Sequence, residues 1–375
     1  MKILALEPFY AGSHRQFLDG WIARSEHDWT VLGLPGHKWK WRMRHAPITF
    51  ADEVRRRVTV GELWDAIFCS DMLSLGEFLS LSPKELRTLP TIAYFHENQF
   101  TYPTRTSESR DFHFAFTNYV TALTADQVWF NSKFHRDDFL SATEAFLRRM
   151  PDHQETSTVD EIRKKSVVQY PGVEPSSVPR NTDPRPLTIL WSSRWEHDKN
   201  AQVFFKALEL LKTNRVDFNL NMLGESFGQV PEIFARARAH FSGHILNWGF
   251  ATSRDRYYDI LAESDVIVST AIHEFFGIAV VEAMRVGVRP LLPNRLAYPE
   301  LLEQIPGGGA EYLYDGGVGD LAKRLEQLAT ENPHPIDPKW FARFDWQERA
   351  RAMDLEIGRA RSLDPANTSQ QKPLD

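Results

Sequence analysis

Residues 2–22, KILALEPFYAGSHRQFLDGWI, contain the pattern that decides the fold. An apolar run at 2–6 is followed by Pro8 and by a turn at 11–14 that contains a glycine. The apolar residues after the turn fall at helical spacing, at positions 17, 18, 21 and 22. The stretch therefore predicts a buried strand, a glycine turn and a helix, which is the first unit of an α/β fold.

The same rhythm extends outward along the chain. In the first half, apolar runs that indicate strands lie at 29–34, 63–69, 90–95 and 127–131. The rhythm restarts in the second half, with strands expected at 187–192, 218–223, 245–249, 266–269 and 289–293 and helices at 201–212, 231–240, 254–263, 277–285, 320–330 and 345–360. Strands that alternate with helices predict parallel sheets. We therefore expect an α/β protein with two tandem Rossmann-like domains and a cleft between them.

A polar, proline-rich stretch separates the two halves and predicts the domain boundary. We expect an N-terminal domain at 1–170, a linker at 171–186 and a C-terminal domain at 187–362. The last helix is able to pack back on the first domain, and residues 363–375 form a polar tail.

Composition excludes several classes of protein. The chain has 375 residues, of which 42% are hydrophobic and 25% charged, as in ordinary globular domains. A single cysteine, Cys69, excludes a disulfide framework and a cysteine-rich zinc site. No apolar run is long enough to span a membrane, and the first residues do not fit a signal peptide, so we expect a cytoplasmic protein.

The net charge of −6 argues against nucleic-acid binding by bulk charge. The charge is uneven, however, because residues 1–180 hold 22 Lys and Arg against 23 Asp and Glu. The first half is therefore the better place to look for a basic surface.

The strongest chemical motif is HEFFGIAVVEA at 273–283, in which Glu274 and Glu282 stand eight residues apart. A helix that begins near Gly277 would direct free N–H groups at a phosphate. A carboxylate on each side of such a site can accept hydrogen bonds from sugar hydroxyls. Two solvated surface glutamates are an equally good interpretation of this pair alone.

A second motif, WSSRWEHDKN at 191–200, places Arg194 and Lys199 between a strand and a helix. Cations there can neutralise a diphosphate, although solvated loop cations are the better explanation when the motif is taken alone. Gly12, Ser13 and His14 follow the first strand but lack the full glycine fingerprint of a nicotinamide enzyme.

The segment YFHENQFTYP at 94–103 carries His96 from the end of an apolar strand into a loop. A histidine at this edge can position or polarise a reacting group, and a structural histidine is the alternative.

Together these motifs resemble the retaining glycosyltransferases of family four, which have a two-Rossmann GT-B architecture. The resemblance implies that Glu274 contacts the donor sugar, Glu282 the nucleotide ribose, and Arg194 and Lys199 the diphosphate. It also implies a catalytic role for Glu274 and His96. The further residues that it assigns to donor binding are Gly12, Phe276, Gly277 and Ile278, and those that it assigns to acceptor binding are Ser13, His14 and Asn98.

Five long segments of the first half resemble the tRNA-queuosine mannosyltransferase family: LEPFYAGSHRQFLDG, LPGHKWKWRMRHAPITFA, CSDMLSL, YFHENQFTYP and WFNSKFHRDDFL. The resemblance implies transfer of mannose from GDP-mannose, as co-substrate, to queuosine in aspartate tRNA. No Asp-x-Asp pair follows a strand, so we expect no metal and no cofactor. A lipid or polysaccharide acceptor and a non-catalytic RNA-binding protein remain as alternatives, and the sequence leaves the oligomeric state open.

Residues 37–45, HKWKWRMRH, alternate basic and apolar side chains. On a strand, this alternation would place Lys38, Lys40, Arg42 and Arg44 on one face, as an acceptor-binding surface for RNA phosphates and bases. An amphipathic edge strand with solvated cations is the alternative.

Overall fold

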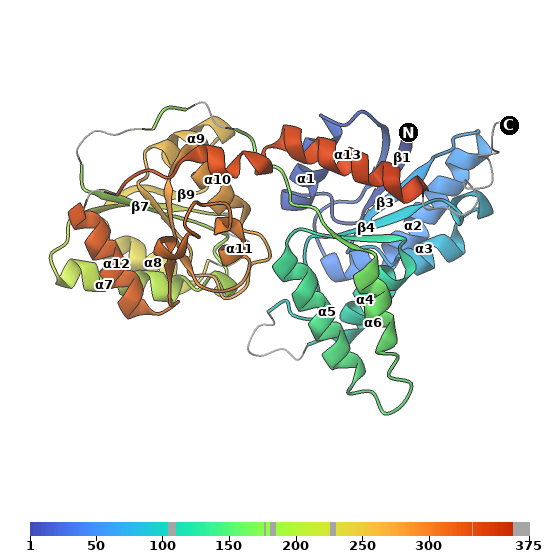
Figure 1. The fold of residues 1–375 in the computed structure, drawn as a ribbon, viewed down its shortest axis with the longest axis horizontal. Coiled ribbons are helices and arrows are strands. Elements are labelled where there is room, and N and C mark those ends of the chain that lie inside the picture. Colours follow the sequence, from blue (N-terminus) through green and yellow to red (C-terminus); the bar gives the residue numbers. More distant parts are fainter. Residues whose placement is uncertain (104–109, 176–177, 181–184, 226–229, 332, 363–375) are drawn as a thin grey trace. The chain divides into compact units, whose positions relative to one another are not determined.

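The computed structural model describes residues 1–103, 110–175, 178–180, 185–225, 230–331 and 333–362, and it divides into two units (Figure 1). The first unit comprises Met1–Gly172 and the chain from Trp346 onward, and the second comprises Val173–Asp345. Each unit is built on one six-stranded sheet, and every named strand pair in both sheets is parallel. The predicted α/β class is therefore confirmed.

The first sheet has the strand order β2-β1-β3-β4-β5-β6. Its strands are β1 (Lys2–Glu7), β2 (Asp28–Gly33), β3 (Ala66–Ser70), β4 (Thr91–Phe95), β5 (Gln127–Phe130) and β6 (Ser166–Val168). Its helices are α1 (Gly12–Ile22), α2 (Trp39–Thr59), α3 (Leu75–Leu81), α4 (Phe112–Thr124), α5 (Lys133–Leu147) and α6 (Ser157–Lys164), with a short 3-10 helix, η1 (Lys84–Leu86).

Both faces of this sheet are covered, which is why its central strands are continuously apolar. Along β1, Leu4 and Leu6 pack into one core cluster, and Ile3 and Ala5 pack into a second on the opposite face. Helix α13 (Trp346–Ser362) packs with α1 on that second face.

The indole of Trp346 anchors helix α13 to the first unit. It lies so close to Gly20 and Gly172 that a Cβ on either glycine would come within about 2.4 Å of the ring. The second domain had been expected to run to residue 362. It ends at Asp345, because the apolar face of α13 is buried against α1, which is the packing of the last helix on the first domain that the sequence analysis allowed.

The second sheet has the order β12-β11-β10-β7-β8-β9. Its strands are β7 (Leu187–Ser192), β8 (Phe218–Leu223), β9 (Ile245–Gly249), β10 (Val266–Val268), β11 (Arg289–Pro293) and β12 (Leu313–Tyr314). Its helices are α7 (Ala201–Thr213), α8 (Glu232–His240), α9 (Arg254–Ala262), α10 (Ile278–Val286), α11 (Tyr298–Leu302) and α12 (Val318–Glu331), with 3-10 helices η2 (His197–Lys199), η3 (Ala310–Tyr312) and η4 (Pro338–Phe344).

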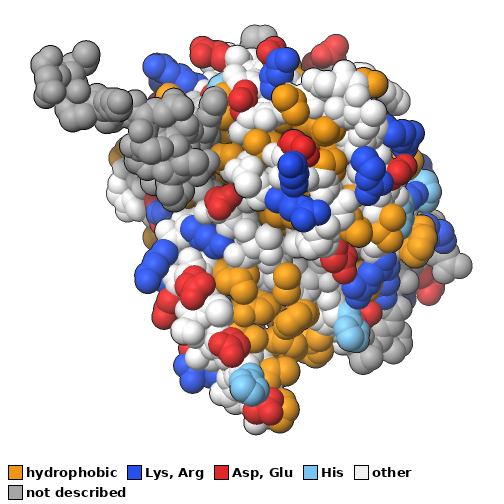
Figure 2. All heavy atoms as spheres, turned by 90° about the vertical axis from the view of Figure 1, so that its right-hand side faces the viewer, with side chains coloured by type: hydrophobic (Ala, Val, Ile, Leu, Met, Phe, Trp, Pro, Cys, Tyr) orange, Lys and Arg blue, Asp and Glu red, His pale blue; other side chains and the backbone are white. Residues whose placement is uncertain are grey.

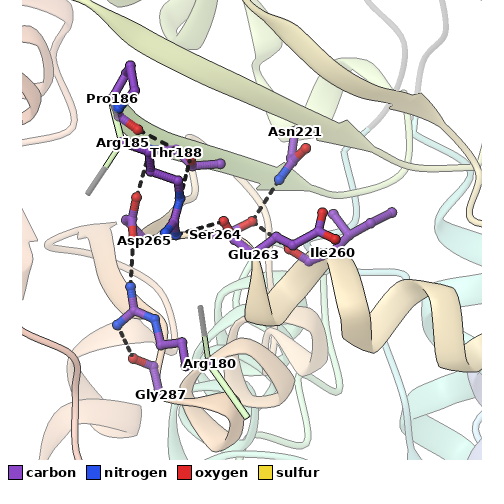
Figure 3. A network of polar contacts seen from close by, with 10 residues as sticks. All are labelled: Arg180, Arg185, Pro186, Thr188, Asn221, Ile260, Glu263, Ser264, Asp265 and Gly287. Atoms are coloured by element: carbon purple, nitrogen blue, oxygen red, sulfur yellow. Dashed lines mark hydrogen bonds and ion pairs between the residues drawn. The ribbon is translucent and has the colours of Figure 1, made fainter. Parts of the chain in front are cut away.

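Part of the expected linker belongs to this second unit (Figure 3). Arg180 and Arg185 both donate to Oδ1 of Asp265, at 2.8 and 2.9 Å, and the N–H of Thr188 donates to Oδ2 at 2.9 Å. Arg180 also donates to the carbonyl of Gly287. These contacts fix the chain before β7 to the loop before β10, at the edge opposite the carboxyl ends of the strands.

The prediction of a strand at 37–45 is wrong, because these residues begin helix α2. Lys38 precedes the helix in a left-handed conformation with φ 55°. The buried residues of α2 recur at helical spacing and decide the outcome: Met43, Ala46, Pro47, Phe50, Ala51 and Val54.

Candidate active site

In the second unit, the candidate donor site is built on the loop between β10 and α10. Helix α10 begins directly after Gly277, close to the expected position. Gly277 has φ 90°, a conformation that favours glycine, and a Cβ there would come within 3.2 Å of the Tyr298 ring. The first N–H groups of a helix have no partner within it and attract anions, so this turn suits a phosphate.

Lys199 and Glu274 form a buried ion pair beside this turn. The Lys199 ammonium is 3.2 Å from Oε2 of Glu274, 3.2 Å from Oδ2 of Asp198 and 2.9 Å from the carbonyl of His273. Burial opposes the charge on Lys199, but Glu274 and Asp198 outweigh it and raise the pKa of the lysine. The structure thus brings together a cation and a carboxylate that lie 75 residues apart in sequence.

The charge of Lys199 also shifts the pKa values of two residues in this loop, Glu274 and His273. Burial raises the pKa of Glu274, but the Lys199 charge and hydrogen bond, with the N–H of Phe276, lower it overall. Burial and then the Lys199 charge lower the pKa of His273 to about 4. Near neutral pH the loop therefore presents an ionised glutamate, a charged lysine and a neutral imidazole.

Arg194 lies at the end of the strand β7 segment and is more exposed than Lys199. Its guanidinium is 3.4 Å from Glu196, and 44% of its side chain is accessible. Arg194 is therefore accessible to solvent, whereas Lys199 is buried among its partners.

Glu282 lies inside α10, 4% exposed, and is held by two residues of α9. Arg254 donates to its Oε1, and the Tyr257 hydroxyl donates to its Oε2 at 2.9 Å. Burial outweighs these partners and raises the pKa of Glu282. Sequence reasoning missed Arg254 and Tyr257, because only the fold shows that α9 lies against α10.

The two apolar residues expected at the donor site have different surroundings. Phe276 is 3% exposed and packs edge-on against Phe344, so its ring belongs to the core while its N–H donates to Glu274. Ile278 is the first residue of α10, where its backbone N–H borders the phosphate turn.

In the first unit, the carboxyl ends of β1 and β4 bring Gly12, Ser13, His14 and His96 to one edge. Gly12 opens α1 with φ 52° and has open space around it, and Ser13 is exposed. The imidazoles of His14 and His96 face each other, with centroids 3.9 Å apart and planes inclined by 31°.

A buried carboxylate that the sequence analysis missed holds this pair. Oε2 of Glu7, the last residue of β1, lies 3.2 Å from Nδ1 of His14. Burial lowers the pKa of His14, but the Glu7 charge and hydrogen bond outweigh it and raise that pKa to about 9. Burial, then the His14 charge, lowers the pKa of His96 well below its ordinary value. The only available sequence signal was an acidic residue ending an apolar strand.

Asn98 requires a correction. Its side chain is fully buried, and its Oδ1 accepts from the N–H groups of Phe100 and Thr101 and from the Thr101 hydroxyl. Its amide lies 3.4 Å from Asp138. A side chain used in this way shapes the loop after β4, and it does not present itself to an acceptor.

Glu7, His14 and His96 offer ligand atoms within 4.8 Å of one another, the distance range of a metal cluster. Two imidazoles that bind one metal ion must direct a nitrogen lone pair from each ring at that ion. The rings of His14 and His96 lie face to face with their planes inclined by 31°, so their nitrogen lone pairs do not point at one another. Nδ1 of His14 is also engaged by Glu7. We therefore interpret the cluster as a hydrogen-bonding site, and independence from metal stays a prediction.

The four cations expected on one face are divided by helix α2. Successive residues turn by about 100°, so Lys40 and Arg44 share a face that Arg42 does not. Arg44 lies over the Phe114 ring at 4.8 Å and Lys40 over Trp39 at 5.7 Å, while Arg42 donates to the Pro35 carbonyl. Lys38 precedes the helix and is exposed.

The surface of the first unit seen in Figure 2 carries side chains of both charges, interspersed around a hydrophobic patch. It shows no uniform basic field. Among the described residues, no helix is both long enough and apolar enough to cross a membrane.

Comparison with known proteins gives a family match for each half of the chain. A tRNA-queuosine alpha-mannosyltransferase N-terminal family model matches residues 2–173, and a glycosyl transferases group 1 model matches residues 174–343. The tRNA-queuosine alpha-mannosyltransferase of Drosophila melanogaster is 36% identical over 311 residues, which cover 80% of this chain and 81% of the relative. A GDP-mannose:cellobiosyl-diphosphopolyprenol alpha-mannosyltransferase of Komagataeibacter xylinus is 26% identical over 46% of each chain.

Solved glycosyltransferase structures share the fold. The apo form of the lipopolysaccharide outer core galactosyltransferase WaaB superposes with a TM-score of 0.64 at 13% identity, covering 96% of this chain and 99% of its own. Anabaena HepE in complex with UDP superposes with a TM-score of 0.62 at 16% identity, covering 98% and 100%. The fold is thus GT-B, and the chain belongs to the tRNA-queuosine alpha-mannosyltransferase family.

Proposed function

We propose that this enzyme is a retaining glycosyltransferase that moves mannose from GDP-mannose to queuosine in aspartate tRNA. Family membership supports the reaction. The observation that carries the chemistry is the buried Lys199–Glu274 pair beside the first turn of α10. We extend the proposal to a cytoplasmic location, which a tRNA acceptor supports.

In the transfer, the bond from the sugar anomeric carbon to the β-phosphate oxygen breaks, and a bond to an acceptor hydroxyl oxygen forms on the same face. Negative charge develops on the departing GDP, to which the hydroxyl proton can pass. The Lys199 ammonium, the Arg194 guanidinium and the N–H groups at the start of α10 meet that charge. Fixed groups of this kind stabilise a transition state without reorganising.

The two glutamates take different parts of the donor. Glu274 is ionised and keeps acceptor capacity beyond its bond to Lys199, so it binds mannose hydroxyls. Glu282 is fixed by Arg254 and Tyr257 and binds the ribose hydroxyls with its remaining lone pairs. Gly12, Phe276, Gly277 and Ile278 complete the donor side through backbone contacts.

The acceptor meets the first unit. Ser13, His14 and His96 present their polar groups at the carboxyl edge of its sheet, and Lys38, Lys40 and Arg44 offer cations to tRNA phosphates. His96 is the neutral member of the imidazole pair and is thus able to accept a hydrogen bond from the acceptor hydroxyl.

A donor panel tests the first half of this proposal. The protein is incubated with GDP-mannose, GDP-fucose, UDP-glucose and UDP-galactose in the presence of queuosine-containing tRNA and a chelator, and release of the nucleotide is measured. We expect release from GDP-mannose alone, and its loss in Glu274→Gln, which should still bind GDP. Turnover of a UDP-sugar instead, or a Glu274→Gln variant as active as wild type, would overturn the donor assignment.

A further inference from the structure

Glu7 is a buried carboxylate to which the proposed reaction gives no role. It is 3% exposed at the end of β1, and its two oxygens have separate partners. Oε1 accepts from the N–H of Phe9 and from the hydroxyl of Ser70, both at 2.9 Å. These two bonds shape the turn that follows β1.

Oε2 has a different partner, the Nδ1 atom of His14 at 3.2 Å. A carboxylate oxygen accepts hydrogen bonds, so Nδ1 carries the proton in this contact. The second ring nitrogen, Nε2, is then left for a ligand, and it makes no hydrogen bond to any described residue. Glu7 thus controls which atom of His14 is available.

The His14 ring is also held against His96. The two centroids are 3.9 Å apart, and Phe9 and Phe17 bound the pair edge-on at 5.9 and 5.2 Å. The backbone of His96 is fixed in turn, because its N–H donates to Asp71 and its carbonyl accepts from Asn131, both at 2.9 Å. Two imidazoles with opposite protonation therefore lie against each other at the carboxyl edge of the sheet.

We propose that Glu7 is a positioning residue for glycosyl transfer: it fixes the proton and the plane of His14, so that His14 Nε2–H and His96 together bind the acceptor diol. The inference rests on the proposed function, because the diol is that of queuosine. A vicinal diol suits this arrangement, since its neighbouring hydroxyls can accept from one imidazole and donate to the other. An acid that orients a histidine in this way acts on the reaction only through that histidine.

Glu7→Gln tests the role, with Ser70→Ala as its matched control. Glutamine keeps the shape and can still accept from Phe9 and Ser70, but it is uncharged and its NH₂ group would face Nδ1. The raised pKa of His14 should then be lost, so that His14 becomes neutral and its proton is no longer fixed on Nε2. Ser70→Ala removes a bond to the same carboxylate and leaves the His14 contact intact. We expect Glu7→Gln to lower kcat for transfer to queuosine tRNA by roughly tenfold or more, with unchanged GDP affinity. Ser70→Ala should retain kcat.

Imidazole ¹⁵N spectra of histidine-labelled protein supply a readout that a purely structural role would not move. Near neutral pH we expect the His14 resonances to change from those of an imidazolium to those of a neutral imidazole in Glu7→Gln and to stay in place in Ser70→Ala. Circular dichroism and thermal unfolding establish that both variants fold. If Glu7→Gln folds and transfers at the wild-type rate, the positioning role is wrong while the proposed function stands. If the wild type itself modifies no tRNA, the proposed function has failed instead.

Discussion

At the scale of the residue, the candidate site depends on charges that are paired before any ligand binds. Lys199, 6% exposed, exists as a cation because Glu274 and Asp198 surround it, and Glu274 stays ionised because Lys199 is beside it. Each group therefore keeps its partner in the charged form that a diphosphate sugar requires.

We predict that Arg194→Ala and Lys199→Met each weaken GDP-mannose binding by roughly tenfold to a hundredfold. The physical reason is the loss of one charge-assisted hydrogen bond to the diphosphate, about 1.5–3 kcal/mol. Titration calorimetry measures the change, with Lys206→Ala, an exposed cation on α7, as the control. If the folded double variant binds GDP-mannose with wild-type affinity, neither residue contacts the donor.

The pKa of His14 leads to a prediction about stability. Folding raises that pKa from 6.5 to about 9, so the contribution of His14 is complete below pH 6.5 and is lost as the pH rises through 9. Asp71 also makes the protein less stable as the pH rises, because its pKa in the folded state is raised to about 8, chiefly by burial. We expect the wild type to lose on the order of 3 kcal/mol from the His14 effect over this interval.

Urea unfolding at about pH 6 and about pH 9.5 checks this expectation, with Asp71→Asn and His14→Gln compared to wild type. The decline should be smaller in His14→Gln. Equal declines in wild type and His14→Gln would show that Glu7 does not hold a charged imidazole.

At the scale of the element, most strands could be predicted, and helix α2 was mistaken for a strand at its start. Buried parallel strands are short apolar runs, and β7, β8, β9 and β11 have the bounds expected from sequence. The alternation over 37–45 suggested a strand. The chain forms helix α2 instead, because the apolar residues that continue to Val54 fall on one face of a helix. A nine-residue window shows only the start of that face. Glu7, Arg254 and Tyr257 were missed because pairing between distant elements leaves no mark in the local sequence.

The corrected position of the cations changes the test of the acceptor surface. Lys40→Glu with Arg44→Glu reverses the one face of α2 on which two cations stand together. We expect weaker tRNA binding, unchanged GDP binding and a flatter dependence of tRNA affinity on salt, because fewer phosphates are neutralised. Arg42 is left intact, since it supports the Pro35 loop.

Arg163→Glu with Lys164→Glu makes the same change of charge on α6 and serves as the control. Filter binding over a series of salt concentrations measures both variants. If the α2 variant keeps the wild-type affinity and salt slope, tRNA binds elsewhere.

A second prediction at this scale concerns the network in Figure 3. Asp265→Asn would leave the guanidinium groups of Arg180 and Arg185 without their shared carboxylate. We expect the unfolding free energy of the second unit to fall by roughly 3 kcal/mol, because breaking a largely buried ion pair leaves charge uncompensated. Thermal unfolding measures this effect, and Asp255→Asn, an exposed change on α9, should have little effect. A similar melting temperature in both variants would show that the network does not stabilise the second unit.

At the scale of the whole molecule, two sheets divide the chemistry. The second unit holds the groups suited to a nucleotide sugar, and the first holds the imidazole pair and the cations suited to an acceptor. The cleft expected between them stays a prediction. Division of donor and acceptor between units explains why the donor motifs were readable from sequence: each lies within one loop. The proposed acceptor side draws on Glu7, His14, Asp71 and His96, from separate segments, and the sequence motifs indicated the two histidines but not the two carboxylates.

The central claim is that this chain adds mannose to queuosine in tRNA. It is tested most directly by mass spectrometry of nucleosides from two aspartate tRNA samples, identical except that one carries queuosine and the other guanine at that position. After incubation with GDP-mannose, we predict that queuosine gains the mass of one hexose and that the guanine-containing tRNA is unchanged. Absence of that gain with folded, GDP-binding protein, or equal modification of both samples, would contradict the account.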